Sequence, residues 1–75
     1  MPNNKSNWTF KEVVKFLESN NFRLIHIKGS HYNYSGNCEG KVRLVSVPKH
    51  KTIATGTMGG IIKQSGIPKE KWIEK

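Results

Sequence analysis

The chain has a single cysteine, Cys38, among its 75 residues, and this limits how it can fold. One cysteine forms neither an internal disulfide nor a cysteine-based zinc site, which are common supports of small proteins. A chain of this length makes one domain and buries only about 60% of the surface that the unfolded chain exposes. Stability must therefore come from one hydrophobic core, without room for a deep substrate cavity. We expect residues 1–8 to be a flexible N-terminus and residues 9–75 to form a single domain.

The first predicted element is a helix that begins after Thr9. Thr9 and Glu12 have the T-x-x-E spacing of a capping box, in which each side chain satisfies the backbone donor of the other residue. Trp8 and Val13 occupy the two positions of a hydrophobic staple. The polar residues 19–21 end the helix. Between these ends, apolar residues recur at helical spacing on one face: Phe10, Val13, Val14 and Leu17.

Gly29-Ser30 divides the next segment into two strands. A two-residue connection that begins with glycine suits a type II′ hairpin turn, because glycine adopts a positive φ without steric cost. The turn sets a register of four pairs: Lys28 with His31, Ile27 with Tyr32, His26 with Asn33, and Ile25 with Tyr34. Alternate residues of a strand share a face. One face is therefore predicted to be apolar and to pack against helices: Ile25, Ile27, Tyr32 and Tyr34. The other face is predicted to be polar: His26, Lys28, His31 and Asn33.

The second half of the chain predicts a third strand and a second helix. Residues 36–40 read as a turn, and a strand follows over residues 41–47 until Pro48, which cannot donate to a ladder. Thr55 is placed to cap a helix, and Gly66 suits the left-handed position just past its end. The apolar residues of this helix fall on one face: Met58, Ile61 and Ile62. The tail, with Trp72 and Ile73, is expected to add a short turn that covers one end of the core. These elements predict an α+β fold of α-β-β-β-α order, with a three-stranded antiparallel sheet and two helices on one face.

The charge of the chain favours a polyanionic partner. Thirteen Lys and Arg against five Glu, with no Asp, give a net charge of +8, and the pI of about 9.9 is in the range of nucleic-acid-binding domains. Five scattered Glu do not form the carboxylate cluster of a two-metal nuclease, and a triad with an Asp is excluded. The glycine-rich residues 56–60 lack the lysine of a phosphate-binding P-loop. No apolar run is long enough for a signal peptide or a membrane span, so we expect a cytoplasmic protein without membrane contact.

Three histidines, His26, His31 and His50, lie among lysines and an arginine in the middle of the chain. Histidine exchanges protons near neutral pH without a metal ion, and the neighbouring cations attract a phosphodiester backbone. The sequence therefore places candidate proton-transfer groups within a candidate polyanion site. Two other interpretations stay open from the residues alone, namely ordinary surface histidines of a basic domain and a zinc site of three histidines.

Four segments occur in the order and spacing of one known family: Lys28-Gly29-Ser30-His31, Val47-Pro48-Lys49-His50, Ile53-Ala54-Thr55-Gly56-Thr57-Met58 and Ile61-Ile62-Lys63-Gln64-Ser65-Gly66-Ile67. Together they resemble the HicA-type toxins, which are small bacterial mRNA interferases. The resemblance covers residues 9–68. It implies a double-stranded-RNA-binding-like fold, in agreement with the elements predicted above. It also implies RNA cleavage without a metal or other cofactor, with the motif histidine His31 as the catalytic residue.

Six residues near His31 are candidate RNA-binding residues: Lys28, Gly29, Ser30, Lys49, His50 and Lys51. Lys28, predicted opposite His31, would stabilise charge that develops on the scissile phosphate. Ser30 would donate its hydroxyl to a phosphate, and the basic residues 49–51 would follow the RNA backbone. The simpler interpretations are turn geometry for the glycine and serine, and solvated surface side chains for the basic residues.

The resemblance predicts the toxin of a type II toxin–antitoxin system, with mRNA as its substrate and a HicB-type antitoxin as its protein partner. His31 would deprotonate the 2′-hydroxyl beside the scissile phosphate or protonate the leaving 5′-oxygen. Cleavage of mRNA would block translation and growth. Two alternatives belong to other classes, a non-catalytic double-stranded-RNA-binding module and an adaptor that binds only protein.

Overall fold

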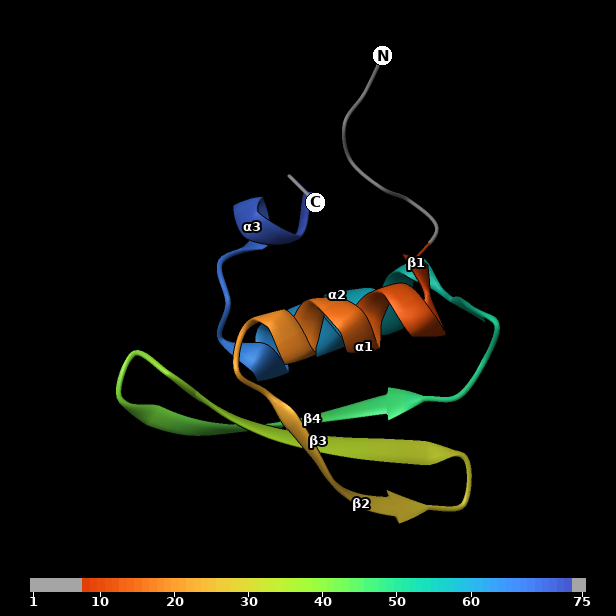
Figure 1. Ribbon diagram of the computed structural model, residues 1–75. Helices are drawn as coiled ribbons and strands as arrows, with labels where there is room; N and C mark the ends of the chain where they lie inside the picture. The colour runs from red at the N-terminus through yellow and green to blue at the C-terminus, as the bar shows by residue number, and fades with distance from the viewer. Residues whose placement is uncertain (1–7, 74–75) are drawn as a thin grey trace.

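The computed structural model describes residues 8–73, in which two helices lie over one face of a sheet (Figure 1). The elements follow in the order β1 (Trp8–Thr9), α1 (Phe10–Ser19), β2 (Arg23–Lys28), β3 (His31–Cys38), β4 (Lys41–Pro48), β5 (Thr52–Ile53), α2 (Thr55–Ser65) and α3 (Lys69–Ile73). β2, β3 and β4 form an antiparallel sheet in that spatial order. No described element covers the opposite face of this sheet, which we call the open face (Figure 1). The predicted α+β architecture, with both helices on one face, is confirmed.

Helix α1 begins and ends as its sequence predicts. The backbone N–H of Thr9 donates to Glu12 Oε1 at 3.0 Å, and the backbone N–H of Glu12 donates to Thr9 Oγ1 at 3.1 Å, so both bonds of the capping box are present. At the other end, Asn20 is the C-cap, and Asn21 has a φ of 69°. A left-handed asparagine stops the helix because the chain can no longer continue the helical hydrogen bonds.

A two-stranded sheet of β1 and β5 was not expected from the sequence. It pairs Trp8 with Ile53 and Thr9 with Thr52. Two-residue strands carry too little periodicity to be recognised along the chain. Trp8 falls in the segment expected to be flexible, yet only 3% of it is exposed. Residues 1–7 lie outside the described residues, so the domain boundary stays a prediction.

The β2–β3 hairpin has the predicted register next to its turn. Lys28 pairs with His31, Ile27 with Tyr32, and His26 with Asn33. Gly29 has a φ of 60°, as the first central residue of a type II′ turn requires.

The fourth predicted pair, Ile25 with Tyr34, is wrong. A bulge between Leu24 and His26 leaves Ile25 outside the ladder, and Tyr34 pairs with Leu24. One extra residue in a strand exchanges the faces of the residues beyond it. The bulge thereby turns Leu24 to the helix side and Arg23 to the open face, whereas an unbroken register would do the reverse.

The core lies between the two helices and strands β3 and β4. Its buried apolar residues are Trp8, Val13, Leu17, Phe22, Tyr34, Val45, Val47, Ile53, Met58, Ile61, Ile67 and Trp72. The prediction that Ile25 and Ile27 pack against the helices is wrong, because they are 51% and 48% exposed. The exposure of Ile25 and Ile27 results from the position of the helices over the sheet. Both α1 and α2 pack against β4, and β2 lies at the other edge of the sheet.

The β3–β4 connection is tighter than the predicted turn over residues 36–40. β3 continues to Cys38, and only Glu39 and Gly40 form the turn, with φ values of 55° and 80°. Two consecutive left-handed residues are the requirement of a type I′ hairpin turn. Gly36 therefore lies inside the strand, where the ring of Phe22 occupies the space that a side chain would need.

Helix α2 begins at Thr55, whose predicted role as N-cap is wrong because Ala54 occupies that position. Its end is as predicted, with Gly66 left-handed at φ 75°. The expected turn in the tail is α3, where Trp72 is 1% exposed and its ring lies 5.4 Å from that of Trp8. Among the described helices, none has the length and apolar composition that crossing a membrane requires.

Candidate nucleic-acid interface

His31 stands at the first position of β3, directly after the Gly29-Ser30 turn, with its side chain exposed. In the row that crosses the sheet at this point, Lys28 of β2 lies on one side of His31 and Pro48 of β4 on the other. The next residue, Tyr32, faces the helices and packs against the core. Because side chains alternate along a strand, His31 and Lys28 share the open face.

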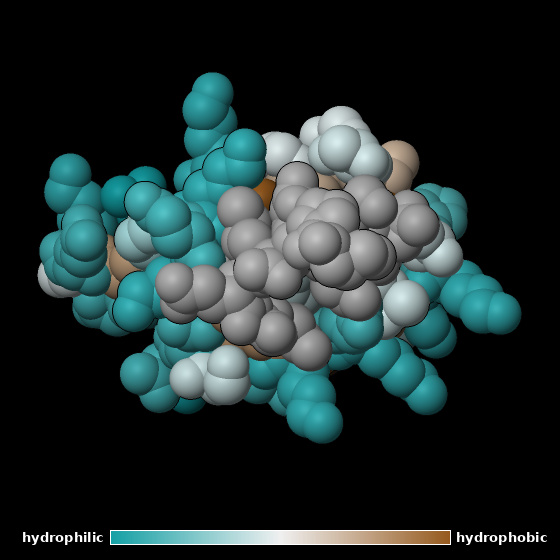
Figure 2. Space-filling model, turned by 90° about the horizontal axis from the view of Figure 1, so that it is seen from above, coloured by the Kyte–Doolittle hydropathy of each residue, from teal (hydrophilic) through white to brown (hydrophobic). Residues whose placement is uncertain are grey.

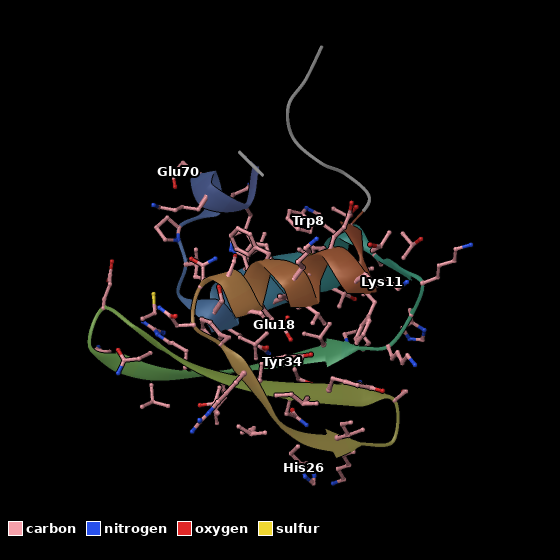
Figure 3. The ribbon with its side chains drawn as sticks, in the orientation of Figure 1. Trp8, Lys11, Glu18, His26, Tyr34 and Glu70 are labelled. Carbon is pink, nitrogen blue, oxygen red and sulfur yellow. The ribbon has the colours of Figure 1, made fainter. Side chains whose placement is uncertain are left out.

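The basic loop of residues 49–51 is held beside the same turn. The backbone N–H of Lys49 donates to the carbonyl oxygen of Ser30 at 2.6 Å, and the N–H of His50 donates to the oxygen of Pro48 at 2.9 Å. The structure therefore brings His31 and the six candidate RNA-binding residues to one end of the sheet, and all seven are exposed. We call this end of the molecule the basic end. His26 lies two rows further along, opposite Asn33, and points away from the helices (Figure 3).

Two tyrosines of β3 lie on the helix side of the sheet, and Tyr32 is the one next to the basic end. The Tyr32 ring contacts that of Phe10 edge-on, with centroids 5.1 Å apart, and Lys49 Nζ lies 5.8 Å from the Tyr32 centroid. Tyr34 is buried beneath α1, as its predicted core role requires (Figure 3). Burial raises the pKa of its phenol above the ordinary value, and the negative charge of Glu18 adds to the effect.

Sequence reasoning missed Lys11, which lies beside the basic loop in space. Lys11 lines a hollow of about 360 Å³ whose other lining residues are Thr9, Phe10, Lys49, His50 and Lys51. The pairing of β1 with β5 and a hydrogen bond from Phe10 N–H to Lys51 O, at 3.3 Å, bring the start of α1 against the loop. No local pattern connects Lys11 with a loop forty residues later, so only the folded chain reveals it.

Four cationic side chains thus gather at the basic end: Lys11, Lys28, Lys49 and Lys51. The carboxylates of the described residues lie elsewhere or are engaged. Glu12 accepts the capping bond of α1, and Glu18 is in the last turn of that helix. Glu39 is at the far turn of the sheet, and Glu70 is in α3. From the helix side, the visible described residues form a mostly hydrophilic surface (Figure 2).

Within residues 8–73, no three His, Cys, Asp or Glu side chains come together in a way that could hold a metal ion. His31 and His50 lie near the same turn, and His26 lies two rows away. The expectation of a reaction without metal or other cofactor stays a prediction, which an assay with a chelator can test.

The α-β-β-β-α order and the single helix-covered face are those of a double-stranded-RNA-binding-like fold, here with a basic end. A family model described as the HicA toxin of bacterial toxin–antitoxin systems matches residues 10–67, more than half of the chain. The chain belongs to the HicA toxin family, and the resemblance noted from its sequence is confirmed. It is accordingly a toxin of a bacterial toxin–antitoxin system, which implies an antitoxin partner. No curated protein and no solved structure matches the chain.

Proposed function

We propose that this toxin is an mRNA endoribonuclease that uses His31 as its general acid or base and needs no metal ion. One observation carries the proposal. His31 is exposed beside Lys28 at the end of the sheet where the basic loop 49–51 is fixed by the bond from Lys49 N–H to Ser30 O. A proton-transfer group and the cations that attract a polyanion therefore lie at the same end of the sheet, with Lys28 on the same face as His31.

In the proposed reaction, a single RNA strand lies across the basic end with its phosphates near the lysines. The imidazole of His31 takes the proton of a ribose 2′-hydroxyl, and the 2′-oxygen attacks the adjacent phosphorus. The bond from phosphorus to the 5′-oxygen breaks, and that oxygen takes a proton from Lys28, His50 or water. The products are a 2′,3′-cyclic phosphate and a 5′-hydroxyl end.

The lysines supply the second part of the catalysis. Negative charge on the phosphate oxygens grows as the 2′-oxygen attacks, and the ammonium group of Lys28, which pairs with His31 across the hairpin, would stabilise it. General acid or base catalysis by one side chain contributes about 10²–10⁴-fold. Positioning and charge stabilisation by the basic end must provide the remaining acceleration.

This activity explains why such a chain would be toxic. Cleavage of mRNA in the cytoplasm stops translation and growth, and a HicB-type antitoxin would suppress it by covering the basic end. A net charge of +8 would steer an acidic partner toward the toxin.

The test is cleavage of single-stranded RNA by the purified chain in the presence of EDTA. We expect His31→Ala to lose about 10²–10⁴-fold in rate while it still binds RNA. His26→Ala is the matched control, because His26 is an exposed histidine on the same face two rows away, and it should keep the activity. Cleavage that needs a divalent ion, or that survives His31→Ala, would contradict the proposal. Intact RNA that the wild-type chain binds would instead indicate the double-stranded-RNA-binding module.

A further inference from the structure

Strand β2 is exposed along its whole length and forms one edge of the sheet. Within residues 8–73 it pairs only with β3, so no described strand lies beside the backbone groups on its outer side. All six of its side chains, from Arg23 to Lys28, are exposed. An edge strand of this kind presents a row of N–H and C=O groups to which another chain can pair.

The opposite edge differs, because α2 reaches it. In β4, the backbone N–H of Ser46 donates to Oε1 of Gln64 in α2 at 3.0 Å. Both helices pack against β4. The two edges of the sheet therefore differ in their capacity to pair with another strand, and the β2 edge is the accessible one.

Three of the six β2 side chains are large and apolar. Leu24, Ile25 and Ile27 are 42%, 51% and 48% exposed, and residues 24–27 line a shallow hollow of about 370 Å³. Leu24 and Ile27 are on the helix side of the sheet, since they pair with Tyr34 and Tyr32. RNA phosphates gain nothing from apolar side chains, so this combination favours a protein strand over nucleic acid.

The charged side chains of β2 limit which protein strand can pair. Arg23, His26 and Lys28 lie on the open face, because they pair with Ser35, Asn33 and His31. Antiparallel pairing of β2 with a second copy would set Arg23 opposite Lys28 at both ends, between chains that each carry a net charge of +8. Like charges directly opposite each other destabilise a strand pair. The chain therefore disfavours its own copy and favours an acidic strand.

We infer that β2 is the docking edge for a β-strand of the antitoxin in which apolar and acidic residues alternate. The apolar residues of that strand pack beside Leu24 and Ile27 on the helix side, and its acidic residues face Arg23, His26 and Lys28 on the open face. Only the name of the partner rests on the toxin function, because the edge, its exposure and its charges are properties of β2 itself.

Docking at this edge would also block the basic end. Neighbouring strands are about 4.8 Å apart, so an added strand lies about 10 Å from β3. An acidic side chain opposite Lys28 stands in the same row as His31 and competes with a phosphate for the Lys28 ammonium group.

The experiment uses a capped eight-residue peptide of alternating glutamate and valine as the probe, and the same peptide with lysine for glutamate as its control. Residue-resolved amide exchange of the full chain is measured by NMR. With the glutamate peptide at about ten times its Kd, exchange of the outward amides of residues 23–28 should slow about tenfold, and RNA cleavage should fall. The lysine peptide should leave the amide exchange unchanged; it is compared by exchange alone, because lysines also bind the RNA substrate.

Two variants locate the contact. Ile27→Thr keeps a strand-forming residue but removes apolar contact area, and it should weaken peptide binding about fivefold. Leu44→Thr makes the same kind of change at a residue of β4 that is 63% exposed, and it should have no effect. Both variants should cleave RNA as the wild-type chain does.

The outcomes separate this inference from the nuclease proposal. No binding of the glutamate peptide up to about 1 mM overturns the docking edge, whether or not the chain cleaves RNA. Equal binding of both peptides also overturns it, as does protection of the β2 amides by RNA in place of the peptide. Peptide binding at β2 by a chain that leaves RNA intact would support the docking edge and refute the nuclease.

Discussion

Replacing Lys28, Lys49 and Lys51 together by alanine tests whether the basic end holds RNA. All three side chains are exposed and lie at one end of the sheet beside His31. For single strands, each phosphate that a cation neutralises contributes about −0.7 to the slope of log affinity against log salt concentration. Three such contacts contribute about −2. Between about 50 and 200 mM salt, this share of the affinity falls about 20-fold, and the triple variant should lose that dependence.

The assay is the salt dependence of binding to a 2′-O-methyl RNA strand, which lacks the hydroxyl that attacks the phosphate. The matched control replaces Lys15, Lys63 and Lys69, which are exposed lysines of α1, α2 and α3. Both triple variants lower the net charge from +8 to +5, so a general charge effect would change them equally. If the control variant loses as much of the salt dependence as the other, binding is not localised at the basic end.

Two further predictions concern the scaffold that holds this surface. Gly36→Ala should destabilise the fold by about 1–3 kcal/mol, because the added Cβ would lie 2.5 Å from Cγ of the buried Phe22 ring. In Gly60→Ala, in α2, the added Cβ meets no atom within 4 Å, and this variant should stabilise the fold by about 0.5–1 kcal/mol. Urea unfolding measures the free energy of unfolding of both variants. Equal changes in the two variants would refute the packing argument. Burial raises the pKa of Tyr34 in the folded chain, so the unfolded chain releases this proton first and stability falls as the pH rises above about 10. Tyr34→Phe should reduce this loss of stability. The measurement is the free energy of unfolding between about pH 8 and 11, and a decline in the variant equal to that of the wild type would contradict the prediction.

The misplaced residues of β2 show where sequence reasoning stops. Alternation correctly predicts that Ile27 shares a face with Tyr32. It cannot predict that the helices above that face pack over β4 and leave β2 beyond them. Ile27 is consequently half-exposed, whereas Val47, on the other side of Tyr32, is fully buried. A periodic pattern gives the direction of a side chain, but burial requires a second element on that side.

The candidate site divides in the same way. The motif around His31 and the turn before it could be recognised from adjacent residues, and the structure places Lys28 opposite His31 as expected. Lys11 could not be found, because it reaches the basic loop only through the pairing of β1 with β5.

The features that the sequence alone determined are those set by neighbours along the chain. Thr9 and Glu12 satisfy each other's backbone donors, and Gly29 and Gly66 adopt left-handed conformations that other residues avoid. The tertiary structure alone decided which edge of the sheet stays open and which lysines join the basic end. These depend on packing between segments that are distant in the sequence. The free energy of that packing comes from apolar area buried across the whole core, and no short window of residues contains this information.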